Sequence, residues 1–392
     1  MTLDLRAHFS TFRDAAPGRI HLAAHSHHFW PDAACAAHQR LIADTAKRAD
    51  HKWDAVFGTL IPRAQRGIAA LLGLPDPSTI AFAPNTHEFV VRLISSLPLG
   101  RPLYVLTSDS EFHSFSRQMA RFEEDGVVVE RISAEPFATF PARFAAAARH
   151  GGHDLVYVSQ VFYNSGATAG ALATLVAAVP DPETLIVIDG YHGYMALPTD
   201  LSGIAARAFY LSGGYKYAMA GEGACFMHCP PGYVPRPRVT GWFAAFGALS
   251  APQDGHIAYG SDGSRFMGAT FDPTGLTRAA AVLDWMDEIG LTVAAIHDHV
   301  LALADLFCSE IVRQKLTALR EARLVTSLDA GTARGNFLTF ETPRANDIHA
   351  RLAGADIVTD VRGERIRFGF GCYHAAEEIA PAVAAIARAL GD

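Results

Sequence analysis

The 392-residue chain has few charged residues, 19% of the total, with no basic run and a formal net charge of −7. Without clustered Lys or Arg it has no electrostatic footprint for nucleic acid, so we expect a small-molecule substrate and no nucleic-acid partner. No apolar run reaches the roughly 18 residues needed to span a bilayer, so we expect no membrane partner either. Its first segment, Met1–Arg13, carries charge and lacks the apolar core of a secretory signal.

Cysteine is scarce, and the five residues form no framework. Scattered thiols of odd number favour a reducing compartment over disulfides, so we expect a cytoplasmic protein. The spacing of Cys225 and Cys229 has no matching second pair, which argues against a zinc site. The cysteines are Cys35, Cys225, Cys229, Cys308 and Cys372.

Several catalytic motifs are absent as well. The sequence has no Gly-x-Ser-x-Gly elbow and no Gly-x4-Gly-Lys-Ser/Thr phosphate loop. Gly221–Phe226 does not complete the Gly-x-Gly-x-x-Gly pattern that a nicotinamide-dependent reductase would need. No His-Glu-x-x-His motif is present, so we expect no metal and interpret an N-terminal histidine group as structural or substrate-contacting. That group comprises His21, His25, His27 and His28.

Half of the residues are hydrophobic, enough for a sizeable core. From about residue 75 to 230, short apolar runs alternate with amphipathic stretches, which predicts an α/β fold with a mostly parallel seven-stranded sheet and helices on both faces. The candidate strands are Thr79–Ala83, Leu103–Thr107, Gly126–Ile132, Asp154–Val161, Thr184–Asp189, Ala208–Ser212 and Gly223–His228. Helical patterns between them include Ser114–Glu124, Phe137–Arg149 and Thr168–Val179.

Beyond residue 230 the pattern changes. Residues 230–275 are rich in Pro and Gly and predict a loop. A helical region over Gly275–Arg320, further strands and a closing helix near Ala375–Leu390 predict a smaller α+β C-terminal domain. The strand candidates there are Leu324–Ser327, Phe337–Glu341 and Arg365–Phe370. We predict a large domain over residues 31–275 and a small domain made of residues 1–30 and 276–392.

Three polar features follow the apolar runs in a fixed order. Leu185–Asp189 is a buried strand ending in a carboxylate, Tyr210–Lys216 runs from a strand through a small-residue turn to a lysine, and Ala83–Glu88 opens a helix. Each alone has an ordinary explanation, as a strand-terminal Asp, a surface Lys or a helix cap. Together they predict a pyridoxal 5′-phosphate site. The lysine would form a Schiff base, the aspartate would stabilise a protonated pyridine nitrogen, and the helix start would bind phosphate.

The motifs that carry these residues resemble the class V aminotransferase family of fold type I enzymes, and within it kynureninase. The resemblance rests on Asp189-Gly-Tyr-His192 and Ser212-Gly-Gly-Tyr-Lys-Tyr217, with weaker likeness at Ser159–Gly166, Thr240–Phe243 and Ile366–Phe368. It extends from about His21 to Arg388 and implies a homodimer, because some segments of that family close the site of a second subunit.

The resemblance also implies roles for individual residues. Catalysis would fall to Lys216, Asp189 and His192. Phe112 would stack on the cofactor, and Arg367 would hold the substrate carboxylate as a bidentate fork. The remaining cofactor-binding candidates are Asn85, Thr86, His87, Tyr215, Trp242 and Thr270. His25 and Ser26 are substrate-binding candidates, because His25–His28 stands where the family has Asn-Ser-Leu-Gly.

The function implied is a kynureninase-like hydrolase or lyase that acts on an amino acid through an external aldimine and Cα deprotonation. Besides the change at His25–His28, two further departures affect the substrate: Phe112–Phe115 lacks the family's acidic residue, and Asp272-Pro273 replaces its Asn-Pro. An aminotransferase or a β-eliminating C–S lyase of class V would use the same residues and is the alternative. Desulfurase chemistry is disfavoured, because Arg351–Asp356 lacks the loop cysteine of those enzymes. A non-catalytic ligand-binding protein is the third possibility.

Overall fold

The computed structural model describes residues 3–98, 100–248, 255–329 and 331–392. Its largest feature is a seven-stranded sheet of order β2-β8-β7-β6-β5-β3-β4, in which β8 alone runs antiparallel to its neighbours. The strands are β2 Ile80–Ala83, β3 Tyr104–Ser108, β4 Val128–Ile132, β5 Leu155–Ser159, β6 Leu185–Asp189, β7 Ala208–Ser212 and β8 Cys225–His228. Each predicted strand of this region is present, and the expected α/β class is confirmed.

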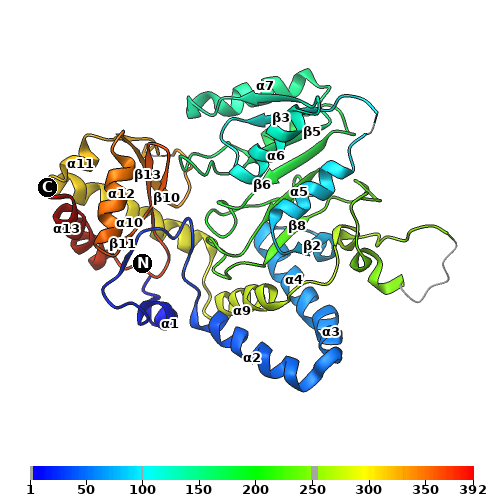
Figure 1. Ribbon diagram of the computed structural model, residues 1–392, viewed down its shortest axis with the longest axis horizontal. Helices are drawn as coiled ribbons and strands as arrows, with labels where there is room; N and C mark the ends of the chain where they lie inside the picture. Colours follow the sequence, from blue (N-terminus) through cyan, green and yellow to red (C-terminus); the bar gives the residue numbers. More distant parts are fainter. Residues whose placement is uncertain (1–2, 99, 249–254, 330) are drawn as a thin grey trace.

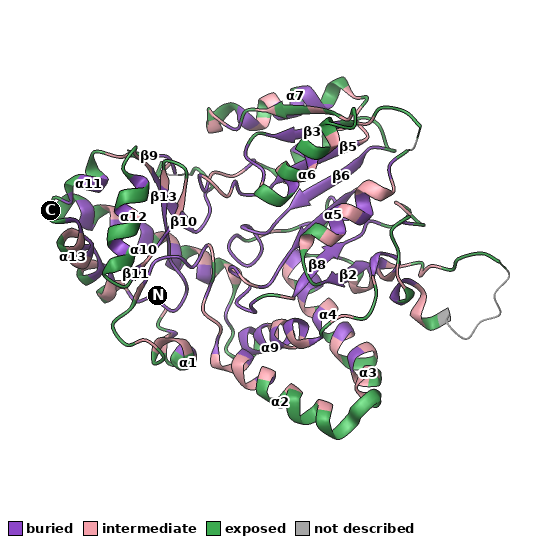
Figure 2. Cartoon of the chain, viewed as in Figure 1, coloured by how far each residue is buried: buried purple, intermediate pink, exposed green. Residues whose placement is uncertain are grey.

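The central strands lie deep in the molecule. All residues of β5, β6 and β7 are buried, so both faces of the sheet are covered, as their continuous apolar runs require. Figure 2 shows this buried layer, with exposed residues concentrated on the outer helices. The helices beside the sheet are α4 Ile61–Leu72, α5 Thr86–Ser95, α6 His113–Glu123, α7 Phe140–His150 and α8 Leu172–Ala177.

A helical region precedes the sheet and was not among the predicted elements. It consists of α2 Asp32–Arg48, α3 Lys52–Ala55, a π-helical turn at Val56–Leu60, and α4. Helix α9, Thr274–Glu288, packs against both α2 and α4 (Figure 1). The predicted domain boundary at residues 275 and 276 lies in the first turn of α9, and the division into two domains stays a prediction.

The C-terminal part contains an antiparallel sheet of order β12-β13-β10-β9. Its strands are β9 Arg323–Leu324, β10 Phe337–Glu341, β12 Asp360–Arg362 and β13 Arg365–Gly369. The accompanying helices are α10 Val293–Arg313, α11 Thr317–Arg320, α12 Ala345–Gly354 and α13 Ile379–Leu390. A short parallel pair, β1 Ile20–His21 with β11 Ile357–Val358, joins the N-terminal segment to this part.

Two predicted helices differ from the structure for local reasons. The region Gly275–Arg320 is divided into α9, α10 and α11, because Gly290 (φ +66°) ends α9 and Thr292 caps α10 by accepting from the Ala295 backbone N–H. The helix predicted from Thr168 begins only at Leu172, beyond Gly170 (φ +91°).

Crossing a membrane requires a helix that is both long and apolar. In the described ranges no single helix has both the length and the apolar character to cross a membrane, and α9 with α10 meet that test only as a pair bent by 89°.

Candidate active site

The carboxyl ends of β6 and β7 form one side of a cavity of about 430 Å³. These strands are parallel neighbours, with Asp189 paired to Leu211, so Asp189 and the turn after β7 reach the same edge of the sheet. The cavity brings together most of the predicted site residues: Lys216, Asp189, His192, Phe112, Asn85, Thr86, His87 and Tyr215.

Asp189 is a buried carboxylate held by two donors. Its Oδ2 accepts from the Tyr157 hydroxyl at 2.8 Å, and its Oδ1 accepts from the Tyr191 backbone N–H at 2.9 Å. Burial raises the pKa of this carboxyl, while both hydrogen bonds and the nearby Lys216 oppose that rise. The arrangement fixes a carboxyl group beside the cavity, where a cationic partner would stabilise its charged form.

Lys216 is buried at the same end of the cavity, only 4% exposed. Its Nζ lies 3.3 Å from His192 Nδ1, and 4.5 and 5.0 Å from the ring centroids of Tyr191 and Phe112. Burial lowers the pKa of this amine to about 7, against the opposing effect of Asp189. A substantial fraction of the amine is therefore neutral near neutral pH, as a nucleophile or a general base must be.

His192 follows Asp189 in the same turn and is also buried. Burial, and then the positive charges of Lys216 and Arg367, hold the pKa of its imidazole well below the usual value. The ring is therefore neutral at physiological pH and can exchange a hydrogen bond with the Lys216 amine.

Another part of the cavity wall is the N-terminus of α5, a helix of 10 residues. Asn85 is its N-cap, and its side chain accepts from the Glu88 backbone N–H at 3.0 Å. Thr86 is half-buried and begins the helix, while His87 is exposed. The unpaired backbone N–H groups and the helix dipole at such an end favour an anion such as a phosphate.

These groups fit pyridoxal 5′-phosphate. The cavity offers an amine for the aldehyde, a buried carboxyl group held by neutral donors for the ring nitrogen, and a helix end for the phosphate. Phe112 is half-buried in its wall, within contact range of Lys216, where an aromatic ring can cover a flat cofactor.

Arg367 and His25 lie next to the cavity and are not among the residues that line it. Arg367, on β13, is buried; its guanidinium donates to the carbonyl oxygen of Tyr163, a lining residue, and to Asp360. His25 is completely buried, and Ser26 contacts His27 with 3.2 Å between Oγ and Nδ1. Tyr163 therefore links the predicted carboxylate-binding arginine to the cofactor cavity.

Trp242 and Thr270 contact each other and lie outside this cavity. The Trp242 indole N–H is 3.3 Å from Thr270 Oγ1, and the Trp242 side chain is 47% exposed. The resemblance makes both residues cofactor-binding candidates in segments that close the site, often from the second subunit, and their roles stay predictions.

Sequence reasoning missed other residues of the site. Glu111 is buried behind Phe112, where it accepts from the hydroxyls of Ser108 and Ser159, and burial raises its pKa to about 7. Tyr163, Tyr191 and Ser159 also line the cavity. The motifs of the sequence resemblance contain Tyr163, Tyr191 and Ser159, but only the alignment of strand ends shows that these residues meet.

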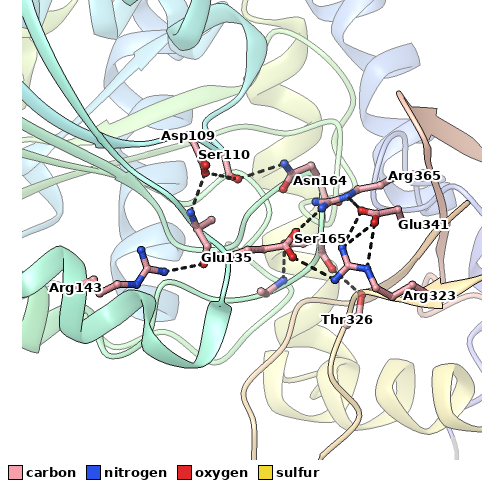
Figure 3. A network of polar contacts seen from close by, with 12 residues as sticks. Asp109, Ser110, Glu135, Arg143, Asn164, Ser165, Arg323, Thr326, Glu341 and Arg365 are labelled. Carbon is pink, nitrogen blue, oxygen red and sulfur yellow. Dashed lines mark hydrogen bonds and ion pairs between the residues drawn. The ribbon is translucent and has the colours of Figure 1, made fainter. Parts of the chain in front are cut away.

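A polar network connects the two sheets beside the site (Figure 3). Glu135, from the loop after β4, pairs with Arg365 of β13 and with Arg323 of β9. Glu341 of β10 binds the same two arginines at 2.8 and 2.9 Å. Because Arg365 is two residues from Arg367 on one strand, the network helps to hold the predicted substrate arginine against the large sheet.

Comparison with known proteins gives one partial family match and many structural ones. Residues 296–386 match the family model of the kynureninase C-terminal domain. No curated protein sequence matches the chain significantly.

A cysteine desulfurase from Thermococcus onnurineus NA1 superposes with a TM-score of 0.80 at 15% identity, covering 100% of this chain and 99% of that one. The cystine C–S lyase C-DES, in complex with its product cysteine persulfide, gives 0.79 at 17% identity, covering 95% and 98%. The cysteine desulfurase CsdA from Escherichia coli gives 0.75 at 16% identity, covering 98% and 97%.

At such low identity these structures establish the fold. The chain has the fold type I architecture of class V pyridoxal-phosphate enzymes, as the sequence resemblance implied.

Proposed function

We propose that this protein is a pyridoxal-phosphate-dependent lyase that removes the β-substituent of an amino acid, with a C–S bond as the preferred target. The observation that carries the proposal is the buried amine of Lys216, which shares a cavity with Asp189 and the start of α5 and has a pKa lowered to about 7. An amine of this kind binds an aldehyde and removes a proton near neutral pH.

The preference for C–S chemistry is supported by the similar structures, which are desulfurases and a C–S lyase and match 95% or more of this chain. A desulfurase would need a cysteine nucleophile. Of the five cysteines, all in described ranges, Cys225 is the one that lines the cavity, and burial raises the pKa of its thiol to about 11. A thiol that stays protonated is a poor nucleophile, which favours elimination without a protein thiol.

Each residue of the site has a separate role in the proposed reaction. Pyridoxal phosphate, when bound, supplies an aldehyde for amines and a ring that withdraws electrons from the substrate Cα. With the group bound, Asp189 would stabilise a proton on the ring nitrogen, and Phe112 would cover the ring. Arg367 binds the substrate carboxylate and so orients the Cα–H bond toward Lys216. The Lys216 amine then removes the Cα proton, and the departing group leaves from Cβ.

Kynureninase-like hydrolysis is the second candidate. The kynureninase C-terminal family model matches residues 296–386, a segment that contains Arg367. The two reactions share Cα deprotonation and differ in products. Elimination gives pyruvate, ammonia and a thiol, whereas hydrolysis at Cβ–Cγ gives alanine and an acid, and transamination would give a keto acid.

A homodimer belongs to the same proposal. Large apolar side chains are exposed in and around the Pro- and Gly-rich segment, including Val239 (43%), Trp242 (47%) and Ile257 (62%). Exposed large apolar side chains are candidates for contact with a second subunit. Sedimentation at several concentrations would test it, and a monomer that holds cofactor and turns over would refute it.

The function is tested with protein supplied with pyridoxal phosphate. We expect a yellow protein in which borohydride fixes the cofactor on the peptide containing Lys216, and a panel of cystine, cysteine, S-alkylcysteines and kynurenines should give pyruvate from the sulfur compounds. Alanine from kynurenines alone would select the second candidate. A protein that binds no cofactor would refute both.

A further inference from the structure

Two arginines share one carboxylate just outside the cavity. Asp360 on β12 accepts from Nη2 of Arg367, and its other oxygen accepts from Nη1 of Arg362 at 2.6 Å. The pairing of β12 with β13 places Asp360 directly opposite Arg367. Asp360 is therefore hydrogen-bonded to the guanidinium that, under the proposed function, binds the substrate carboxylate.

His25 completes this cluster and has an unusual environment. Its side chain is 0% exposed, and neither ring nitrogen has a hydrogen-bond partner in the described structure. The ring stacks on Phe337, with centroids 4.8 Å apart, and it packs so closely on Gly369 of β13 that an added Cβ there would clash with its Nδ1. Buried polar groups without partners are rare in native proteins, so this imidazole calls for a second state in which it is paired.

The partner available to His25 is Asp360. The distance from His25 Nε2 to Asp360 Oδ2 is 3.7 Å, slightly longer than a hydrogen bond. The same Oδ2 binds Arg367. A small movement of the Asp360 carboxyl group would exchange the arginine for the histidine.

The charges around His25 come from several elements. Arg367 of β13, Lys216 after β7, Arg362 of β12 and His21 of β1 all oppose a proton on His25, and neutral His192 lies on the cavity side. Asp360 is the acidic group among them. Burial, and then the positive charges of Arg367 and Lys216, hold the pKa of His25 well below its usual value. The ring is therefore neutral while Asp360 is paired with Arg367.

We propose that Asp360 is an internal substitute for the substrate's α-carboxylate, which occupies Arg367 until the substrate replaces it and then pairs with His25. The inference rests on the proposed function. When the carboxylate of an amino acid binds Arg367, Asp360 keeps its contact with Arg362, and His25 takes one proton from solvent. No covalent bond changes, and the negative charge that enters is balanced by that proton.

This exchange makes Asp360 a specificity-determining residue. A carboxylate is needed to displace it, so an amine without one would meet the cofactor while Arg367 stays paired with Asp360. The exchange also makes carboxylate binding depend on pH. Because the pKa of His25 is higher in the bound state than in the free state, binding strengthens as the pH falls and loses this contribution as the pH rises through the bound-state value.

The test compares two probes on the holoenzyme, glycine and ethylamine, each titrated by the change in cofactor absorbance. Glycine carries the carboxylate and ethylamine does not. In Asp360→Asn the competitor is uncharged, so we expect the glycine Kd to fall roughly tenfold, a typical effect of one charge-assisted contact, and the ethylamine Kd to stay within about twofold. Asp356→Asn is the matched control, since it removes a carboxylate paired with exposed Arg19 and should change neither Kd.

A second measurement does not depend on the stability of Asp360→Asn. In the unmodified protein, the ratio of ethylamine Kd to glycine Kd should rise as the pH falls between about 8 and 6, and His25→Phe, which keeps the stacking on Phe337, should remove that dependence. A glycine Kd that rises or does not change in folded Asp360→Asn would overturn the proposal. So would a pH-independent ratio in the unmodified protein. Failure of the proposed function itself would be visible separately, as a protein without cofactor absorbance.

Discussion

The cavity around Lys216 and the arginine cluster beside it, which consists of Arg367 and Arg362 with Asp360, differ in how their charged groups are paired. Asp189 is fixed by neutral donors, a tyrosine hydroxyl and a backbone N–H, so its charge stays available to a cofactor. Arg367 is instead paired with the charged Asp360, so its charge is already in use. The fixed carboxyl group of Asp189 is suited to a cofactor that stays bound. The pairing of Asp360 with Arg367 can be exchanged, which is suited to a substrate that binds and leaves.

The largest effect should follow from removing the amine at the cavity. Lys216→Ala removes both the cofactor's attachment point and the base, so kcat should fall by about 10²- to 10⁴-fold. The measurement is single-turnover product formation with cofactor in excess. Lys315→Ala, which changes a lysine in the loop between α10 and α11, is the control and should keep full activity. Equal rates for Lys216→Ala and the unmodified protein would show that the amine of Lys216 takes no part in the reaction.

A change in the arginine cluster should act on binding instead. Arg367→Lys keeps a positive charge but loses the fork, so KM should rise by about 10- to 100-fold while kcat changes less. Steady-state kinetics with the best substrate of the panel separates the two constants. Arg344→Lys, an exposed residue at the start of α12, should leave both unchanged. If kcat fell and KM did not change, Arg367 would belong to the chemistry rather than to substrate binding.

The rate of cofactor binding should depend on pH through the Lys216 amine. The pKa of Lys216 is lowered to about 7, so the neutral, reactive amine predominates above that pH and is lost below it. The rate at which the apoprotein gains visible absorbance on adding pyridoxal phosphate should therefore fall about tenfold per pH unit below 7. A rate that falls throughout the range from pH 10 downward would indicate an ordinary lysine.

The smallest effect should come from the network between the sheets. Glu135→Gln removes one charge that binds Arg365 and Arg323, both at least partly exposed, so the free energy of unfolding should fall by less than about 1 kcal/mol. Because Arg365 neighbours Arg367, KM should rise by roughly two- to threefold, an effect that Glu364→Gln on the adjacent exposed turn should not have. A large change in kcat would contradict this division between the two regions.

Much of the cavity could be predicted because its residues follow apolar runs. Asp189 ends a strand and Lys216 follows the next one, so parallel pairing brings these two together. Asn85 caps a helix directly after β2, and it reaches the same edge because β8 lies antiparallel between β2 and β7. The arginine cluster was less predictable from the sequence. Arg367 was predicted, but its pairing with Asp360 depends on the register of two short antiparallel strands, which no local pattern fixes.

The sequence by itself determined the α/β order of elements, the buried strands and the positions of the lysine and aspartate, because apolar periodicity and strand-end chemistry are local properties. Tertiary structure alone decided that Tyr157 holds Asp189, that Asp360 pairs with Arg367, and that His25 is buried without a hydrogen-bond partner among the described residues. These features depend on how separate segments of the chain pair and pack, and their energies depend on burial and distance, which exist only once the chain has folded.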